Sequence, residues 1–189
     1  MAFRVLAFLM LSLSAHAAEL EGVKLEDRIQ VDGQDLQLNG MALRTRYVVI
    51  NVYVAGLYLP QKATSPEAAI DGHGAKRISL TMVRDASAEQ FVESIDHGLR
   101  GNNSEAQLAE VKPQVDALYE KIRAVKEANK GMRIVLDYSP SSSSTTLFVD
   151  GAAQGAPMAG VAFYRALLRI WLGENPVQED LKKALLGGG

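Results

Sequence analysis

Arg44 is the side chain in this sequence whose type and surroundings best suit a chemical role. It follows a turn signal at Asn39-Gly40 and enters a segment whose neighbours are largely apolar. A buried guanidinium needs an anionic partner, because leaving a buried charge unpaired costs several kcal/mol. Its planar fork of N–H donors suits a carboxylate or another oxyanion. The residues alone leave open whether that anion belongs to a ligand or to an acidic side chain of the chain itself.

The other polar groups form no recognised catalytic or metal-binding pattern. His73 lies in a glycine loop with Asp71, and His97 follows Asp96 in a helical pattern. Two separated histidines without cysteine do not predict a zinc site. The serines at 141–144 have no neighbouring base and are typical of a turn, and the sequence contains no phosphate-binding glycine loop or nucleophile elbow. We therefore predict neither a metal site nor a cofactor.

The composition is that of an ordinary globular protein. The 189 residues are 48% hydrophobic and 22% charged, with a formal net charge of -2. This charge gives no reason to expect nucleic-acid binding. The absence of cysteine excludes disulfides and cysteine nucleophiles. The length is enough for one domain with a sizeable core.

The first 18 residues have the three parts of a secretory signal peptide. Arg4 supplies a positive charge, residues 5–13 are nearly all apolar, and residues 15–17 give a small-x-small cleavage pattern. The apolar run is too short for a permanent membrane span. We expect cleavage after residue 17 or 18 and a periplasmic or secreted protein with no stable membrane span. The alternative is a buried N-terminal helix.

Strand and helix signals alternate along the remaining chain. The predicted strands cover residues 28–31, 35–38, 46–59, 76–83, 133–138 and 145–149. The predicted helices begin at Ser65 and Ser87, cover 104–128 with a division at Pro113, and then cover 163–172 and 178–186. Gly56 suggests a bend or bulge within its strand. Hairpin signals such as Asp150-Gly151 favour antiparallel strands, so we expect one α+β domain over residues 19–187.

Several segments resemble the chalcone isomerase superfamily, and they are most similar to its bacterial chalcone-isomerase-like branch. These segments are residues 38–46 (LNGMALRTR), 52–60 (VYVAGLYLP), 83–87 (VRDAS), 98–100 (GLR) and the C-terminal run 160–187. The resemblance covers nearly the whole expected mature chain. It implies an open-faced sandwich in which helices cover one side of a large antiparallel sheet, with a ligand cleft between the two layers.

The resemblance also implies the residues of that cleft. Arg44 matches the arginine that steadies an oxyanion in the enzymes and a carboxylate in the fatty-acid-binding relatives, and Tyr53 matches the next polar contact. These two residues are nine apart, so one continuous strand would point them to opposite faces. A turn or bulge must therefore lie between them, and Tyr47 or Asn51 are alternatives to Tyr53.

Phe91 and Gly98 argue against flavonoid isomerisation. By the resemblance, they stand where the plant isomerases carry a tyrosine and an asparagine. Phenylalanine cannot hold a catalytic water through its side chain, and glycine has no side chain. We expect Phe91 in the cleft wall or the core and Trp171 in the core, and we assign no catalytic residue.

Three functions are compatible with the resemblance. We expect first a protein that is not an enzyme and that binds a small amphipathic molecule, fatty-acid-like or another carboxylate or oxyanion, in an apolar cleft with Arg44 at its polar end. The second is an isomerase or intramolecular lyase in which Arg44 stabilises an enolate-like oxyanion. The third is a structural or partner-binding envelope protein whose cleft is filled.

Overall fold

The protein, described here by a computed structural model over residues 17–47 and 49–188, is built around an eight-stranded antiparallel sheet. The strand order is β11-β10-β9-β6-β5-β4-β3, and β12 also pairs with β10. These strands are β3 (Arg28–Val31), β4 (Gln34–Arg46), β5 (Ile50–Leu59), β6 (Lys76–Met82), β9 (Arg133–Ser139), β10 (Ser144–Val149), β11 (Ala152–Ala153) and β12 (Met158–Ala159). Two further pairs stand apart, β1 (Ala17–Leu20) with β2 (Val23–Glu26) and β7 (Ala86–Ser87) with β8 (Glu127–Ala128).

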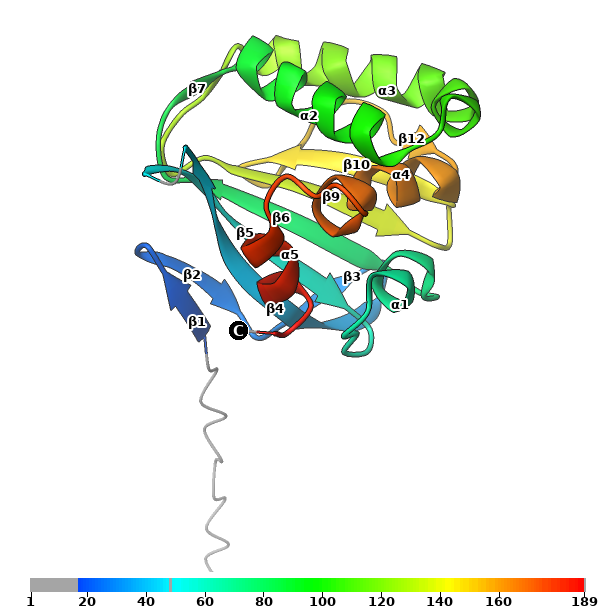
Figure 1. The fold of residues 1–189 in the computed structure, drawn as a ribbon. Coiled ribbons are helices and arrows are strands. Elements are labelled where there is room, and N and C mark those ends of the chain that lie inside the picture. Colours follow the sequence, from blue (N-terminus) through cyan, green and yellow to red (C-terminus); the bar gives the residue numbers. More distant parts are fainter. Residues whose placement is uncertain (1–16, 48, 189) are drawn as a thin grey trace, which may run out of the picture.

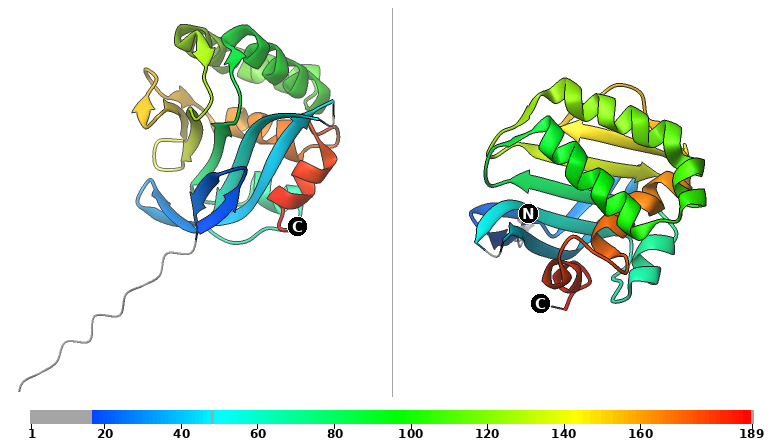
Figure 2. Two further views of the ribbon diagram at one scale, coloured as in Figure 1. Left: turned by 90° about the vertical axis from the view of Figure 1, so that its left-hand side faces the viewer. Right: turned by 45° about the horizontal axis from the view of Figure 1, so that its top comes forward.

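The helices of the described chain cover one face of this sheet (Figure 1). They are α1 (Pro66–Asp71), α2 (Ala88–Asn102), α3 (Glu105–Val125), α4 (Val161–Leu172) and α5 (Glu179–Leu185). Helices α2 and α3 lie side by side, α4 contacts both of them, and α5 packs against β4 (Figures 1 and 2). The predicted α+β sandwich, a large antiparallel sheet with helices on one side, is confirmed.

The main core lies between the sheet and the helices. Alternate residues of a strand point to the same face, so Tyr53, Ala55 and Leu57 of β5 all project toward the helical layer. Helix α4 contributes Phe163 and Leu167, which are fully buried against them. This alternation is what aims Tyr53 at the space beneath the helices.

The opposite face of the sheet is partly covered by the β1–β2 hairpin. Leu25 of β2 packs there in a smaller apolar cluster with Leu38 and Tyr58. A Cβ atom on Gly56 would collide with the Leu25 side chain. The predicted bend at Gly56 is wrong, because β5 passes through this residue with an unbroken register and the glycine instead permits close packing of the hairpin.

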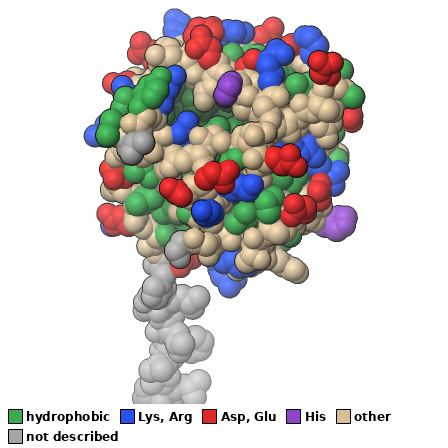
Figure 3. All heavy atoms as spheres, in the orientation of Figure 1, with side chains coloured by type: hydrophobic (Ala, Val, Ile, Leu, Met, Phe, Trp, Pro, Cys, Tyr) green, Lys and Arg blue, Asp and Glu red, His purple; other side chains and the backbone are tan. Residues whose placement is uncertain are grey.

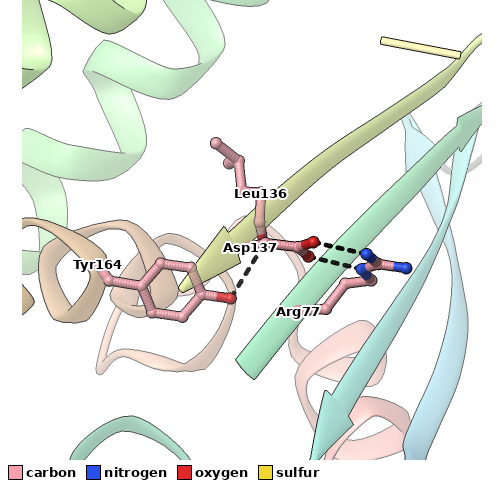
Figure 4. Close-up of polar contacts among 4 residues, drawn as sticks. All are labelled: Arg77, Leu136, Asp137 and Tyr164. Carbon is pink, nitrogen blue, oxygen red and sulfur yellow. Dashed lines mark hydrogen bonds and ion pairs between the residues drawn. The ribbon is translucent and has the colours of Figure 1, made fainter. Parts of the chain in front are cut away.

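A partly buried ion pair joins β6 and β9 on the face away from the helices (Figure 4). Both contacts of the pair, from Arg77 Nε and Nη2 to the two carboxylate oxygens of Asp137, measure 2.5 Å. On the helical side, the Tyr164 hydroxyl of α4 donates to the Leu136 carbonyl at 3.2 Å. The ion pair thus links β6 to β9 on one face, and the Tyr164 hydroxyl links α4 to β9 on the other.

The turn predicted at Asn39-Gly40 is wrong, because both residues lie inside β4, where the register with β5 shifts. The Asn39 side chain is buried, and its Nδ2 donates to the carbonyls of Ala63 and Leu185 at 2.9 and 2.7 Å. A Cβ atom on Gly40 would collide with the Ala184 carbonyl oxygen. Asn39 and Gly40, a pair typical of a turn, therefore form the surface on which α5 packs.

Two other predicted boundaries are wrong. The strand predicted over 46–59 begins only at Ile50, because the chain turns after Arg46. Helix α3 runs through Pro113 without dividing. Proline has no backbone N–H, so the carbonyl of Ala109 has no helical hydrogen-bond donor. Both Pro113 and Ala109 are exposed, so water can replace the missing hydrogen bond.

The predicted signal peptide, residues 1–18, lies outside the described residues except for residues 17 and 18 of β1. Within the described part of the chain, no helix combines the length and the apolar character needed to cross a membrane.

Candidate functional site

The β4–β5 hairpin brings Arg44 and Tyr53 directly opposite each other. Directly paired residues of antiparallel strands share a face, so both side chains project toward the helices. The ladder then skips Val52, and Thr45 pairs with Asn51. The nine-residue separation is no obstacle, because a turn and a bulge lie between two residues on separate strands.

A cleft of about 570 Å³ lies between this end of the hairpin and α2, and Arg44, Tyr53 and Phe91 all line it. Figure 3 shows the molecule hollowed on this face. The volume is within the range of small-molecule sites. The lining is mixed rather than uniformly apolar, because the exposed side of α2 contributes Glu93 and His97.

Arg44 is half-buried and is held by groups of the protein that carry no charge. Its Nη1 donates to the Thr45 carbonyl and, at 3.3 Å, to Oε1 of Gln178. The same Gln178 oxygen accepts a 2.9 Å hydrogen bond from the Thr45 backbone N–H. The ion pairs found among residues 17–47 and 49–188 do not include Arg44. In the described structure, Arg44 is therefore not neutralised by an internal acid.

Tyr53 is oriented by the only tryptophan of the chain. Trp171 Nε1 of α4 donates to the Tyr53 hydroxyl oxygen at 3.0 Å, and both residues are buried. Burial raises the pKa of Tyr53, against the lowering effects of the Trp171 hydrogen bond and of the Arg44 charge, so the hydroxyl keeps its proton at neutral pH. Within the described part of the chain no side-chain hydrogen bond uses this proton. The hydroxyl proton therefore has no protein acceptor in the described structure.

Sequence reasoning missed the supporting role of two residues. The sequence predicts Trp171 as a packing residue. A buried indole N–H requires an acceptor, however, and this requirement signals a polar partner. Gln178 lies 134 residues from Arg44 and carries no local signal of its role. The alternatives to Tyr53 are placed less favourably, since Tyr47 is 74% exposed at the cleft mouth and Asn51 does not line the cleft.

Phe91 and Gly98 of α2 face different surroundings. Phe91 is buried and forms part of the cleft wall. Gly98 faces α4, where an added Cβ atom would lie 2.7 Å from Cγ2 of Ile170. A larger residue at position 98 would meet Ile170 rather than a ligand, so close packing of α2 against α4 explains the glycine at this position.

No metal centre is identified in the described structure. Its histidines and acids form no group of three or more that could hold a metal ion. His97 lies at the cleft rim, whereas His73 lies in an exposed loop and does not line the cleft.

The fold and the cleft define a class of protein in which a curled antiparallel sheet and one helical layer enclose an arginine-bearing site. The chain belongs to the chalcone isomerase-like family, whose model matches residues 17–187. A solved structure of a fatty-acid binding protein from Arabidopsis thaliana is similar, with a TM-score of 0.71 and 15% sequence identity, over 90% of this chain and 96% of that chain. This likeness shows the fold alone. Comparison with curated proteins gave no match.

Proposed function

We propose that the protein binds a small amphipathic carboxylate or other oxyanion in the cleft between the β4–β5 hairpin and α2, without catalysing a reaction. One observation carries this proposal. Arg44 and Tyr53, which both carry hydrogen-bond donors, lie side by side in the lining of the cleft and have no acidic partner in the described structure.

The chemistry of the cleft suits an amphipathic molecule. An oxyanion beside Arg44 would accept from the guanidinium and from the Tyr53 hydroxyl, and hydrogen bonds to charged groups contribute about 1.5–3 kcal/mol each. The apolar part of the ligand would lie against Ile50, Val52 and Phe91. The similar solved structure is that of a fatty-acid binding protein, which supports a long-chain carboxylate as the first probe.

Calorimetric titration with a long-chain fatty acid and with the primary alcohol of the same chain length tests this proposal. The two probes share the apolar tail and differ in charge. We expect the carboxylate to bind about 10- to 150-fold more tightly than the alcohol, the factor that corresponds to one charged hydrogen bond. Equal affinities, or no binding of either probe, contradict the proposal.

The absence of flavonoid ring closure is part of the same proposal. Phe91 brings no hydroxyl to the cleft wall, and Gly98 faces Ile170 of α4. A chalcone incubated with the protein should therefore cyclise no faster than in buffer, as followed by absorbance and chiral chromatography. Stereoselective turnover above the spontaneous rate would show that the cleft is catalytic.

We also propose that the protein is exported across the inner membrane of a bacterium. The charge of Arg4, the apolar run 5–13 and the cleavage pattern at 15–17 support this, as does the resemblance to the bacterial branch of the family. N-terminal sequencing of protein from the periplasmic fraction should find Ala18 or Glu19 first. Native, soluble protein that retains Met1 contradicts export.

A further inference from the structure

The turn between β4 and β5 presents two hydrophobic side chains to water at the mouth of the cleft. Tyr47 is 74% exposed and Val49 is 81% exposed, and they are the only exposed large hydrophobic residues in the described ranges 17–47 and 49–188. Hydrophobic side chains lie beside the hollow at the upper left of Figure 3. Tyr47 also adopts a φ of 51°, a left-handed conformation that non-glycine residues adopt infrequently. Because both side chains belong to one turn, they form a joint apolar surface rather than two scattered residues.

Arginines flank these apolar groups. The Arg46 guanidinium carbon lies 5.2 Å from the centroid of the Tyr47 ring, and Arg84 is exposed at the same cleft mouth. Neither arginine takes part in an ion pair found in the described structure. Two acids also line the cleft. Asp85 accepts a hydrogen bond from the Lys130 backbone N–H at 2.7 Å, and Glu93 lies on α2, across the cleft from the β4–β5 hairpin.

We propose that this tip, defined as Arg46, Tyr47, Val49 and Arg84, docks onto a membrane surface that contains anionic lipids. Tyrosine prefers the boundary between lipid headgroups and acyl chains, and an aliphatic side chain gains from entering the apolar layer. Arginine binds lipid phosphate and is attracted to an anionic surface. The chain as a whole carries a formal net charge of -2, so the attraction comes from this local arrangement.

Docking through the tip would turn the mouth of the cleft toward the bilayer. Arg46, Tyr47 and Arg84 line the cleft as well as forming the tip, so the two features share one face of the molecule. An amphipathic molecule in the bilayer would then reach the cleft without crossing water. The docking is a separate claim from ligand binding, because the vesicle assay below needs no ligand and the fatty-acid titration needs no vesicle.

Vesicle flotation tests the proposal. Wild-type protein should float with phosphatidylcholine vesicles that contain phosphatidylglycerol, and more weakly with pure phosphatidylcholine. Arg46→Glu should lower the partition coefficient about 25-fold, since each unit of charge near an anionic surface is worth about fivefold. The double variant Tyr47→Ser, Val49→Ser should lower it by at least about tenfold.

Arg28→Glu is the matched control, because Arg28 is an exposed arginine that pairs with Gln37, far along β4 from the tip. It should float like the wild type, and all variants should keep the wild-type melting temperature. In a second measurement, the fluorescence of Tyr47→Trp should be quenched by lipids with brominated acyl chains, against the constant signal of buried Trp171. Absence of flotation, equal flotation of wild type and tip variants, or an equal loss in Arg28→Glu overturns the proposal.

Discussion

Trp171 fixes the direction in which Tyr53 can use its hydroxyl group. An indole N–H only donates, so the 3.0 Å contact occupies an acceptor position on the Tyr53 oxygen. Burial raises the pKa of Tyr53 and keeps the hydroxyl protonated. Tyr53 is therefore left as a donor beside Arg44, its cross-strand neighbour. Trp171 does not line the cleft, so we regard it as a positioning residue.

Substitution of these two residues should show that they act as a unit. Tyr53→Phe should weaken carboxylate binding by about 1.5–3 kcal/mol and lower the free energy of unfolding by about 1–3 kcal/mol, because it strands the Trp171 N–H. Trp171→Phe should also weaken binding, although it contacts no ligand. A double-mutant cycle measured by calorimetry should give a coupling energy above about 0.5 kcal/mol, which is the scale for residues in direct contact. Strictly additive effects on affinity contradict the positioning role.

The sequence predicts the polar residues of the site unevenly. Arg44 stands out because a charged residue among apolar neighbours needs an anion. Tyr53 is more difficult, because the argument from strand parity assumes one continuous strand where the chain forms a hairpin. Gln178 could not be predicted, since its contact with Arg44 depends on the placement of α5. Contacts that depend on tertiary packing leave no local pattern.

Gly98 controls the distance between α2 and α4. A Cβ atom at this position would lie 2.7 Å from Cγ2 and 3.3 Å from two further atoms of Ile170. Gly101 lies one turn further along α2, and a Cβ atom added there would meet no heavy atom within 4 Å. The two glycines of one helix thus separate the effect of packing from the effect of helix propensity.

Alanine at these positions should have effects of opposite sign. Gly98→Ala should lower the free energy of unfolding by about 1–3 kcal/mol, because overpacking forces α2 and α4 apart. Gly101→Ala should raise it by about 0.5–1 kcal/mol through helix propensity alone. Urea unfolding measures both variants. Combining Gly98→Ala with Ile170→Ala should cost less than the sum of the two single variants, because the smaller side chain makes room for the new methyl group. Equal stabilisation by Gly98→Ala and Gly101→Ala contradicts close packing at Gly98.

Local signals predict helix starts well in this chain, and the hairpin turn predicted at Asp150-Gly151 forms between β10 and β11, but one clear turn signal fails. The Ser87–Gln90 capping box forms as expected, with both of its hydrogen bonds at 3.2 Å, because all of its atoms belong to one helical turn. The Asn39-Gly40 pair carries an equally clear turn signal but lies within β4. There the decisive contacts come from α5, which is distant in sequence, so the local signal fails.

Lys76 makes the stability of the whole molecule depend on pH. Its side chain is buried, its ammonium group donates to the Gly72 carbonyl, and it lies 5.8 Å from the centre of the Tyr138 ring. Burial lowers the pKa of Lys76 to about 8, and the Arg165 charge acts in the same direction while Asp71 opposes it. The unfolded chain would bind the same proton up to its ordinary pKa of 10.5.

Lys76 should therefore contribute a rise in the free energy of unfolding with pH between about 8 and 10.5. In this window the unfolded state binds more protons than the folded state, so the contribution of Lys76 grows with pH, by at most about 3 kcal/mol. Lys76→Met should remove this rise. Urea unfolding of both proteins at a series of pH values from about 7 to 10 measures the difference. Parallel pH profiles for wild type and Lys76→Met contradict the assignment.

The central claim is that the Arg44 guanidinium binds an anionic group of the ligand rather than an acidic side chain of the protein. The direct measurement is a calorimetric titration of Arg44→Ala and Arg44→Lys with a long-chain fatty acid, alongside thermal melts of both variants. We predict that Arg44→Ala weakens carboxylate binding by about 1.5–3 kcal/mol, that Arg44→Lys recovers part of it, and that neither lowers the melting temperature appreciably. Undiminished binding by Arg44→Ala, or a lowered melting temperature that points to a stranded internal acid, would contradict the claim.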